Sequence, residues 1–408
     1  MSIRPFRALR YNPAQVGDLS GVIAPPYDVI SPAEQEALYG ASPYNVVRLI
    51  LGKQSAADTA DDNRYTRAKR FFDDWRSQGI LERDGEAALY VIEHAFAAEG
   101  RTHTRLGFIA LLDLPPALER AVYRHEATLA APKEDRTRLL GAVPANLEPI
   151  FCVYPDGEGA IHALLQAAAK RLPPAAEARL KGDGLRLWKV TDRDLLRTIS
   201  DALAPSAPLI ADGHHRFEVA YANRKRYGAV MSYFASMAEP SLVVRPIHRL
   251  VRGAGCVMPA ALEGLCHVEP SEGLAPLLAW LGGQRGEGRF GYFDGRAFAR
   301  VTIRPERLAA WLMGPTVPLP VAALDVSILH GLILPELGLN GSAVSYVADA
   351  GEAVKEAAGP DRGAVWLLRG IPLAQVYALA AQGFSLPPKS TYFYPKVPSG
   401  LVFNPHAD

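Results

Sequence analysis

The chain has 408 residues, and 49% of them are hydrophobic. This length exceeds what a single hydrophobic core usually organises. Its 44 lysines and arginines nearly cancel its 43 aspartates and glutamates, and a net charge of +1 argues against nucleic acid or a membrane surface as a partner. The three cysteines, at positions 152, 256 and 266, lack zinc-knuckle or redox-pair spacing, and the first residues lack the apolar run of a signal peptide. We therefore expect a soluble cytoplasmic protein.

The first 150 residues carry signals for both helices and strands. Ser31 at an N-cap position, followed by a proline and by Glu34, predicts a capping box and a short helix. A second helix is expected over 58–78. Its apolar residues fall on one stripe, made of Tyr65, Ala68, Phe72 and Trp75. Two β-prone runs, 87–96 and 103–112, predict a hairpin in a sheet that both helices cover.

The rest of the chain mixes the two kinds of element without regular alternation. Strands are expected at 185–191, 208–211, 230–237 and 242–251, with a hairpin around 294–295. Helices are expected at 160–171, from Thr191 onward, after 213, and at 274–281, 325–334 and 373–382. This pattern predicts the α/β or α+β class, with a mixed sheet and covering helices. Glycines at 253 and 255 predict a boundary between a domain at 1–252 and a smaller α/β domain at 253–408.

Residues 209–220 predict an apolar strand, a sharp turn and a helix. Gly213 permits the turn, and the first N–H groups and the dipole of the helix attract an anion. Arg216 can contact phosphate oxygens with two N–H groups, while His214 and His215 can donate a hydrogen bond or transfer a proton. The alternative is a simple strand–turn–helix corner with solvated histidines.

The pattern Asp-Gly-His-His-Arg-x-x-x-Ala at 212–220 resembles the Gly-x-x-Arg-x-x-Ala signature of the ParB/sulfiredoxin superfamily. Members of that superfamily bind nucleotide phosphates at this turn, and they include an archaeal kinase of free serine that uses ADP. The resemblance implies phosphate or nucleotide binding by Asp212, Gly213, His214, His215 and Arg216, with Mg²⁺ and ADP or ATP as cofactors. The charge of the chain disfavours the DNA-partitioning role of ParB itself.

Over most of its length the chain also resembles the bacterial and archaeal family called domain of unknown function 1015, which has no settled activity. The matching segments are Arg4–Arg7, Ala24–Ser31, His125–Thr128, Pro132–Arg136, Asp212–Arg216, Arg245–Arg249, Leu324–His330 and Pro388–Lys396.

His125 and Glu126 precede a charged, proline-containing segment that we expect to be a loop. The Glu126 carboxylate is suited to deprotonate a substrate hydroxyl, with His125 and His214 as further catalytic candidates. Lys133 and Arg136 are suited to neutralise phosphate charge as it shifts. The alternative is an ordinary solvated charged loop.

Three other segments carry candidate binding residues. Two prolines precede Tyr27 and Asp28, which would be held rigidly toward a substrate or a metal. Near the C-terminus, a proline-stiffened stretch carries basic and hydroxyl side chains suited to phosphate, namely Lys389, Ser390, Thr391 and Lys396. His248 and Arg249 end a strand-like run and are candidates for substrate binding. Each segment could instead have a purely structural role.

No metal site is expected in the protein itself. His125, His214, His215 and Asp212 have the right donors for zinc, but adjacent histidines on one turn rarely reach the same ion. No Walker pattern occurs, which excludes a standard P-loop.

These observations lead to two hypotheses. In the first, the protein transfers a phosphoryl group from a nucleotide to a small hydroxylated metabolite, such as the hydroxy amino acid serine. In the second, it binds a nucleotide or a phosphorylated metabolite without catalysis. We expect the Glu126 loop, the Asp212–Arg216 turn and the Lys389–Lys396 tail to meet in one cleft, because ligand sites favour domain interfaces.

Overall fold

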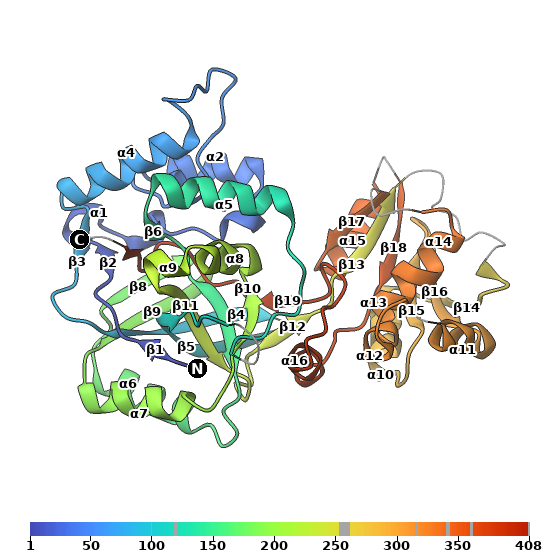
Figure 1. Cartoon of the computed structure of the whole chain (residues 1–408). Helices are drawn as coiled ribbons and strands as arrows, with labels where there is room; N and C mark the ends of the chain where they lie inside the picture. Colours follow the sequence, from blue (N-terminus) through green and yellow to red (C-terminus); the bar gives the residue numbers. More distant parts are fainter. Residues whose placement is uncertain are drawn as a thin grey trace. The chain divides into compact units, whose positions relative to one another are not determined.

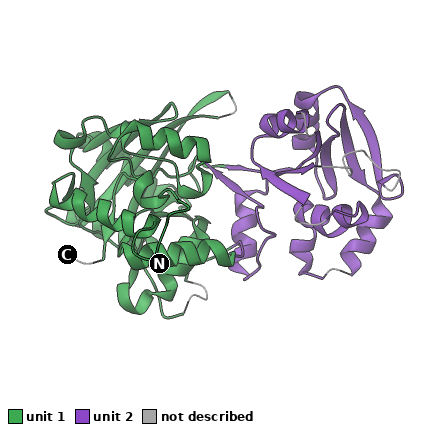
Figure 2. Ribbon diagram, turned by 90° about the horizontal axis from the view of Figure 1, so that it is seen from above, with its two compact units in different colours: residues 1–124, 128–243, 395–408 green, residues 125–127, 244–394 purple. Residues whose placement is uncertain are grey.

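The computed structural model describes residues 1–98, 100–117, 121–252, 262–314, 316–339, 343–359 and 362–406 (Figure 1). The chain forms two compact units, each discontinuous in sequence (Figure 2). Unit 1 contains Met1–Arg124, Thr128–Val243 and Pro395–Asp408, and unit 2 contains His125–Ala127 and Val244–Tyr394. The domain boundary after residue 252 stays a prediction, because a compact unit and an independently folding domain need not coincide.

Unit 1 is built on an eight-stranded sheet of mixed direction. Its order is β10 (Leu209–Asp212), β7 (Ile150–Tyr154), β11 (Ala229–Ser236), β5 (Arg101–Asp113), β4 (Leu89–Ala98), β9 (Asp183–Val190) and β8 (Ala176–Leu180), with β1 (Ile3–Arg4) paired to β5. β7 and β11 run parallel, and the other neighbouring strands of this sheet pair antiparallel. The predicted hairpin is the β4–β5 pair, and the predicted class with a mixed sheet is confirmed.

Helices and short strands complete unit 1. The helical segments are α1 (Pro13–Val16), η1 (Leu19–Gly21), η2 (Tyr27–Val29), α2 (Pro32–Ala41), α3 (Val47–Ile50), α4 (Arg64–Ser77), α5 (Ala130–Ala142), α6 (Ala160–Arg171), α7 (Arg193–Leu203), α8 (His214–Ala222) and α9 (Arg224–Tyr227). The short pairs are β2 (Leu9–Tyr11) with β3 (Leu81–Arg83), and β6 (Ala145–Asn146) with β20 (Asn404–Pro405). Figure 1 shows α4 and α5 on one side of the sheet, and α6 and α7 on the other.

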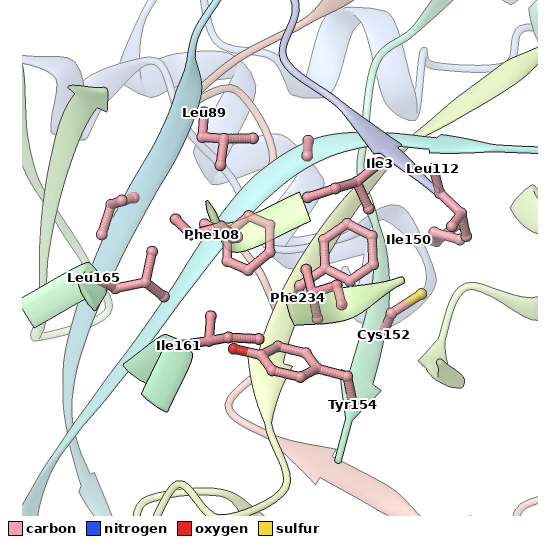
Figure 3. Close-up of a cluster of buried hydrophobic side chains, with 14 of the residues drawn as sticks. Ile3, Leu89, Phe108, Leu112, Ile150, Cys152, Tyr154, Ile161, Leu165 and Phe234 are labelled. Carbon is pink, nitrogen blue, oxygen red and sulfur yellow. The ribbon is translucent and has the colours of Figure 1, made fainter. Parts of the chain in front are cut away.

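Two hydrophobic clusters hold these layers together. In the first, Phe108 and Phe234 of the sheet pack with Ile161 and Leu165 of α6 (Figure 3). The second contains the predicted stripe of α4, together with Leu9 of β2, Val46 just before α3 and Phe403 of the C-terminal segment. Burial of each large apolar side chain contributes roughly 1.5–3 kcal/mol, so both clusters favour the folded unit strongly.

Several local expectations are corrected by the structure. The charged segment expected to be a loop forms α5, and Pro132 is compatible with this helix because it lies in the first turn, where a missing N–H costs little. Asp192, rather than Thr191, caps α7. The strand expected at 242–251 is interrupted at Pro246, since proline cannot donate a ladder hydrogen bond, and it forms two strands. α4 begins at Arg64, after the side-chain cap Asn63.

Unit 2 contains a six-stranded antiparallel sheet. Its order is β14 (Cys266–Ser271), β16 (Phe298–Ile303), β15 (Arg289–Phe293), β18 (Gly363–Leu367), β13 (His248–Arg252) and β17 (Val344–Val347). A second pair joins β12 (Val243–Arg245) to β19 (Tyr392–Tyr394). The hairpin predicted around 294–295 is the β15–β16 pair.

The helices of unit 2 include two that pack on its apolar cluster. Leu277 and Leu281 of α10 (Leu274–Gly283) and Ala353 of α15 (Ala350–Ala357) pack with Leu250 and Val365. The other helices are α11 (Pro305–Met313), α12 (Leu319–Ala322), α13 (Asp325–Ile328), α14 (Leu334–Glu336) and α16 (Leu373–Ala381). Between α13 and α14 the chain forms the π-helical turn η4 (Leu329–Ile333), so the helix predicted at 325–334 is present but not uniform.

Candidate functional site

The predicted turn joins β10 to α8. The register of β10 on β7 shifts between Ile210 and Asp212, which marks a β-bulge just before the turn. Gly213 follows with φ +87°, and a Cβ atom built on it would lie 3.0 Å from the Arg216 guanidinium. The backbone conformation therefore favours glycine here, and any other residue would also press on the Arg216 guanidinium. Gly213 provides no side-chain cap for α8, and the N-terminus of a helix favours negative charge.

The Asp212 carboxylate joins two cations at the start of α8. Arg216 Nη2 donates to Asp212 Oδ2 at 2.8 Å, and Lys396 Nζ forms an ion pair with Oδ1. Arg216 Nη1 donates to the Pro149 carbonyl at 2.5 Å. Arg216 Nε is buried and has no hydrogen-bond partner within the described ranges. Two cations against one carboxylate, beside the positive end of a helix, produce a site that attracts an anion.

Tyr27 and Arg136 lie near the same turn. The Arg136 guanidinium carbon is 3.8 Å from the centre of the Tyr27 ring, a cation–π contact. Burial raises the pKa of Tyr27 to about 12, although Arg136 and Arg216 oppose this shift, so the phenol keeps its proton at neutral pH. Arg136 is itself paired with Asp135, its Nε atom donating to Oδ2 at 2.7 Å. Asp28 is exposed.

The remaining candidates of unit 1 make contacts within the protein. His215 Nε2 accepts the Leu129 N–H at 2.9 Å, at the beginning of α5. Lys133 Nζ lies 3.2 Å from Glu218 of α8. His214 is buried. His215 and Lys133 thus connect α5 to α8, and a phosphate-binding role for either stays a prediction.

In unit 2, His125 and Glu126 hold the turn at 387–391. Glu126 Oε1 accepts the Lys389 N–H at 3.2 Å, and His125 Nε2 lies 2.9 Å from Thr391 Oγ1. Ser390 Oγ donates to the Pro387 carbonyl at 2.5 Å. Lys389 has φ +58°, a left-handed conformation that is rare for residues other than glycine and that often occurs near functional sites.

Arg249 is fully buried behind this turn, and its main partner is a residue outside the sequence-based candidates. Arg249 Nε donates to His330 Nε2 at 2.9 Å, and Nη2 lies 3.4 Å from the Pro388 carbonyl. Burial lowers the pKa of Arg249 to about 10 and that of His330 to about 4. His248 Nδ1 accepts the Leu368 N–H at 3.2 Å. A lone histidine in an apolar helix is typical of a core residue, so sequence alone did not single out His330.

The structure thus gathers the candidates in two groups. Tyr27, Arg136, Asp212, Gly213, Arg216 and Lys396 lie together in unit 1, with Glu148, which sequence reasoning missed. His125, Glu126, Lys389, Ser390, Thr391 and Arg249 lie together in unit 2. That all three segments share one cleft stays a prediction.

The described residues contain no group of three or more histidine, cysteine, aspartate or glutamate side chains that could hold a metal ion. They also contain no helix long and apolar enough to cross a lipid bilayer.

Comparisons with known proteins place the chain in a family. Similar solved structures include free serine kinase with AMP (15% identity, TM-score 0.37, covering 72% of this chain and 92% of that one). A mutant of that kinase with ADP has 14% identity, TM-score 0.38 and the same coverage. C-terminally truncated SbnI from Staphylococcus aureus has 10% identity and TM-score 0.38, covering 72% and 87%. No curated protein matches. Residues 3–327 match the model of a protein family of unknown function, and the chain therefore belongs to the DUF1015 family.

Proposed function

We propose that this protein is a nucleotide-dependent phosphotransferase acting on a small hydroxylated metabolite, such as serine. The observation that carries the proposal is the pair of cations, Arg216 and Lys396, held by Asp212 at the N-terminus of α8. Phosphate oxygens are suited to this place, because a helix N-terminus and two mostly buried cations attract negative charge that solvent screens only weakly.

Phosphoryl transfer asks a protein chiefly for positioning and charge neutralisation. Arg216 would contact the donor phosphates, and Lys396 would neutralise charge on the transferred group. Mg²⁺ would enter with ADP or ATP, since it needs only one or two protein carboxylates beside the phosphates. Both oxygens of Asp212 already contact cations, which makes the exposed Asp28 the better candidate for the metal or the acceptor.

Glu126 is the proposed general base for the acceptor hydroxyl. Its Oε1 atom accepts the Lys389 N–H, and Oε2 accepts no hydrogen bond within the described part of the chain, so it can take a proton. The same Oε1 contact favours the second candidate function, nucleotide or phosphometabolite binding without catalysis, because it gives Glu126 a structural reason to be present.

The test combines binding with turnover. Calorimetric titrations with ADP, ATP, AMP and inorganic phosphate, each with and without Mg²⁺, measure whether the site takes a nucleotide. Phosphorus NMR of protein mixed with a nucleotide and a panel of hydroxylated metabolites then detects transfer. Binding with transfer supports the kinase, binding without transfer supports the binding protein, and the absence of any nucleotide binding contradicts both.

A further inference from the structure

Glu218 is a half-buried carboxylate of α8 that takes no part in the proposed phosphate contacts. Its Oε2 atom accepts the Thr128 hydroxyl at 2.7 Å and lies 3.2 Å from Lys133 Nζ. Its Oε1 atom lies 3.7 Å from Arg124 Nη1. Partial burial tends to raise the pKa of Glu218, but the contacts with Thr128 and Lys133 outweigh this effect and hold the pKa below its usual range. The carboxylate is therefore charged at neutral pH.

Two of these contacts flank the segment that carries the candidate base. The chain leaves unit 1 after Arg124, contributes His125–Ala127 to unit 2 and re-enters unit 1 at Thr128. Glu218 thus binds the last residue before this three-residue excursion and the first residue after it. A second residue of α8 adds to the anchor, because His215 accepts the backbone N–H of the residue that follows Thr128.

The excursion itself is held within unit 2. The Leu386 N–H donates to the His125 carbonyl at 2.8 Å, and the Lys389 N–H donates to Glu126 Oε1 at 3.2 Å. His125 Nε2 lies 2.9 Å from Thr391 Oγ1. The amides of Leu386 and Lys389 therefore report on how firmly the excursion is held.

We propose that Glu218 is a positioning residue for the candidate base Glu126. Glu126 is two residues away from both Arg124 and Thr128. One residue of extended chain spans at most about 3.6 Å, so the Glu126 Cα atom stays within about 7 Å of both flanking Cα atoms. When α8 fixes these two flanking residues, it also restricts the directions in which Glu126 can be presented.

The hydroxyl of Thr128 is the strongest of the three contacts. A hydrogen bond to a charged carboxylate is short and directional, whereas the ion pairs of Arg124 and Lys133 involve partly exposed side chains and are weakened by solvent. Glu218 therefore acts mainly through Thr128. The inference rests on the proposed function only in naming Glu126 as the base, since the anchor itself is independent of turnover.

The first experiment removes the Thr128 hydroxyl and keeps the shape of the side chain. Thr128→Val loses the donor to Glu218, whereas Thr128→Ser retains it and is the matched control. With ADP, Mg²⁺ and L-serine, kcat should fall about tenfold to a hundredfold in Thr128→Val and stay at the wild-type value in Thr128→Ser, because a small misplacement of a reacting group costs this much. Both variants should bind ADP like the wild type in calorimetric titrations.

Glu218→Met removes the acceptor and its charge together. It should lower kcat at least as much as Thr128→Val, and the double variant should lose no more than Glu218→Met alone, because both changes break the same contact. ADP affinity should not weaken, since the loss of a negative charge from α8 does not oppose an anion. Glu36→Met, which breaks an exposed ion pair with Lys53 on α2, is the control and should keep the wild-type kcat.

Amide hydrogen exchange tests the anchor without turnover. The N–H groups of Leu386 and Lys389 should exchange about threefold or more faster in Thr128→Val and Glu218→Met, because the excursion that accepts their hydrogen bonds is then less restrained. Thr128→Ser and Glu36→Met should exchange like the wild type. A role of Glu218 confined to its own surroundings would change exchange in α8 and α5 alone.

The outcomes separate this inference from the proposed function. Wild-type kcat and wild-type exchange at 386–389 in both Thr128→Val and Glu218→Met overturn it, as do equal losses in Thr128→Val and Thr128→Ser. Faster exchange with wild-type kcat overturns the positioning role and leaves the proposed function standing. Faster exchange in a protein that transfers no phosphoryl group to any acceptor supports the anchor and contradicts the proposed function.

Discussion

Lys396 reaches the carboxylate of Asp212 across 184 residues of sequence. The segment that carries Lys396 belongs to unit 1, where Phe403 and the β6–β20 pair also anchor it. The C-terminal segment thus contributes directly to the β10–α8 turn, because it supplies one of the two cations beside Gly213.

Replacing Arg216 with alanine should weaken nucleotide binding. The change removes a charge-assisted contact of about 1.5–3 kcal/mol, which corresponds to a loss of roughly tenfold to a hundredfold in affinity. Calorimetric titration with ADP and Mg²⁺ measures it. Arg226→Ala, at an exposed position of α9, is the control and should bind like the wild type. Unchanged affinity in a folded Arg216→Ala protein would contradict the phosphate site.

Lys396→Met tests the contribution of the C-terminal segment. Methionine keeps much of the side-chain length but leaves Asp212 with Arg216 as its only cation among the described residues, so nucleotide affinity should fall about tenfold and its salt dependence should decrease. The exposed Lys225→Met is the matched control. Equal ADP affinity of the two variants at low and high salt would exclude Lys396 from the nucleotide site.

Glu126→Gln tests the general base. Glutamine still accepts the Lys389 N–H but cannot take a proton, so turnover should fall roughly a hundredfold to ten-thousandfold. ADP affinity should remain within error of the wild type. Single-turnover assays followed by phosphorus NMR measure the rate. A variant that turns over like the wild type would mean that Glu126 serves the turn at 387–391 alone.

The buried His248 should make stability depend on pH. Burial lowers its pKa from 6.5 to about 4, with Arg249 adding to the shift. Below pH 6.5 the unfolded chain therefore binds more protons than the folded one. The free energy of unfolding is unaffected by this group above pH 6.5 and decreases by up to about 3 kcal/mol as the pH falls toward 4.

Urea denaturation between pH 4.5 and 7.5 measures this dependence. In His248→Gln the side-chain oxygen can still accept the Leu368 N–H, and the variant should show a weaker decrease of the midpoint with falling pH. Parallel curves for the wild type and the variant would assign the dependence to other groups.

Local features of the site were predictable from the sequence. The strand, Gly213 and helix at 209–222 follow from short-range preferences, because a glycine with positive φ between an apolar strand and a helical pattern has few alternatives. The stripe of α4 and the β15–β16 hairpin were predictable for the same reason. The charge-rich helix α5 was not predictable from the sequence, because its residues are compatible with both a solvated loop and a helix. Its packing against α8 decides between the two.

Sequence alone therefore determined the kind of residues at the candidate site and the turn that presents them. Only the tertiary structure decided their partners: Lys396 for Asp212, Leu129 for His215 and His330 for Arg249. Each of these pairs joins positions far apart in the chain. These contacts depend on the packing of two hydrophobic clusters and on the return of the C-terminal segment to unit 1. The free energy of that packing is summed over many residues distant in sequence, so a local sequence pattern cannot predict it.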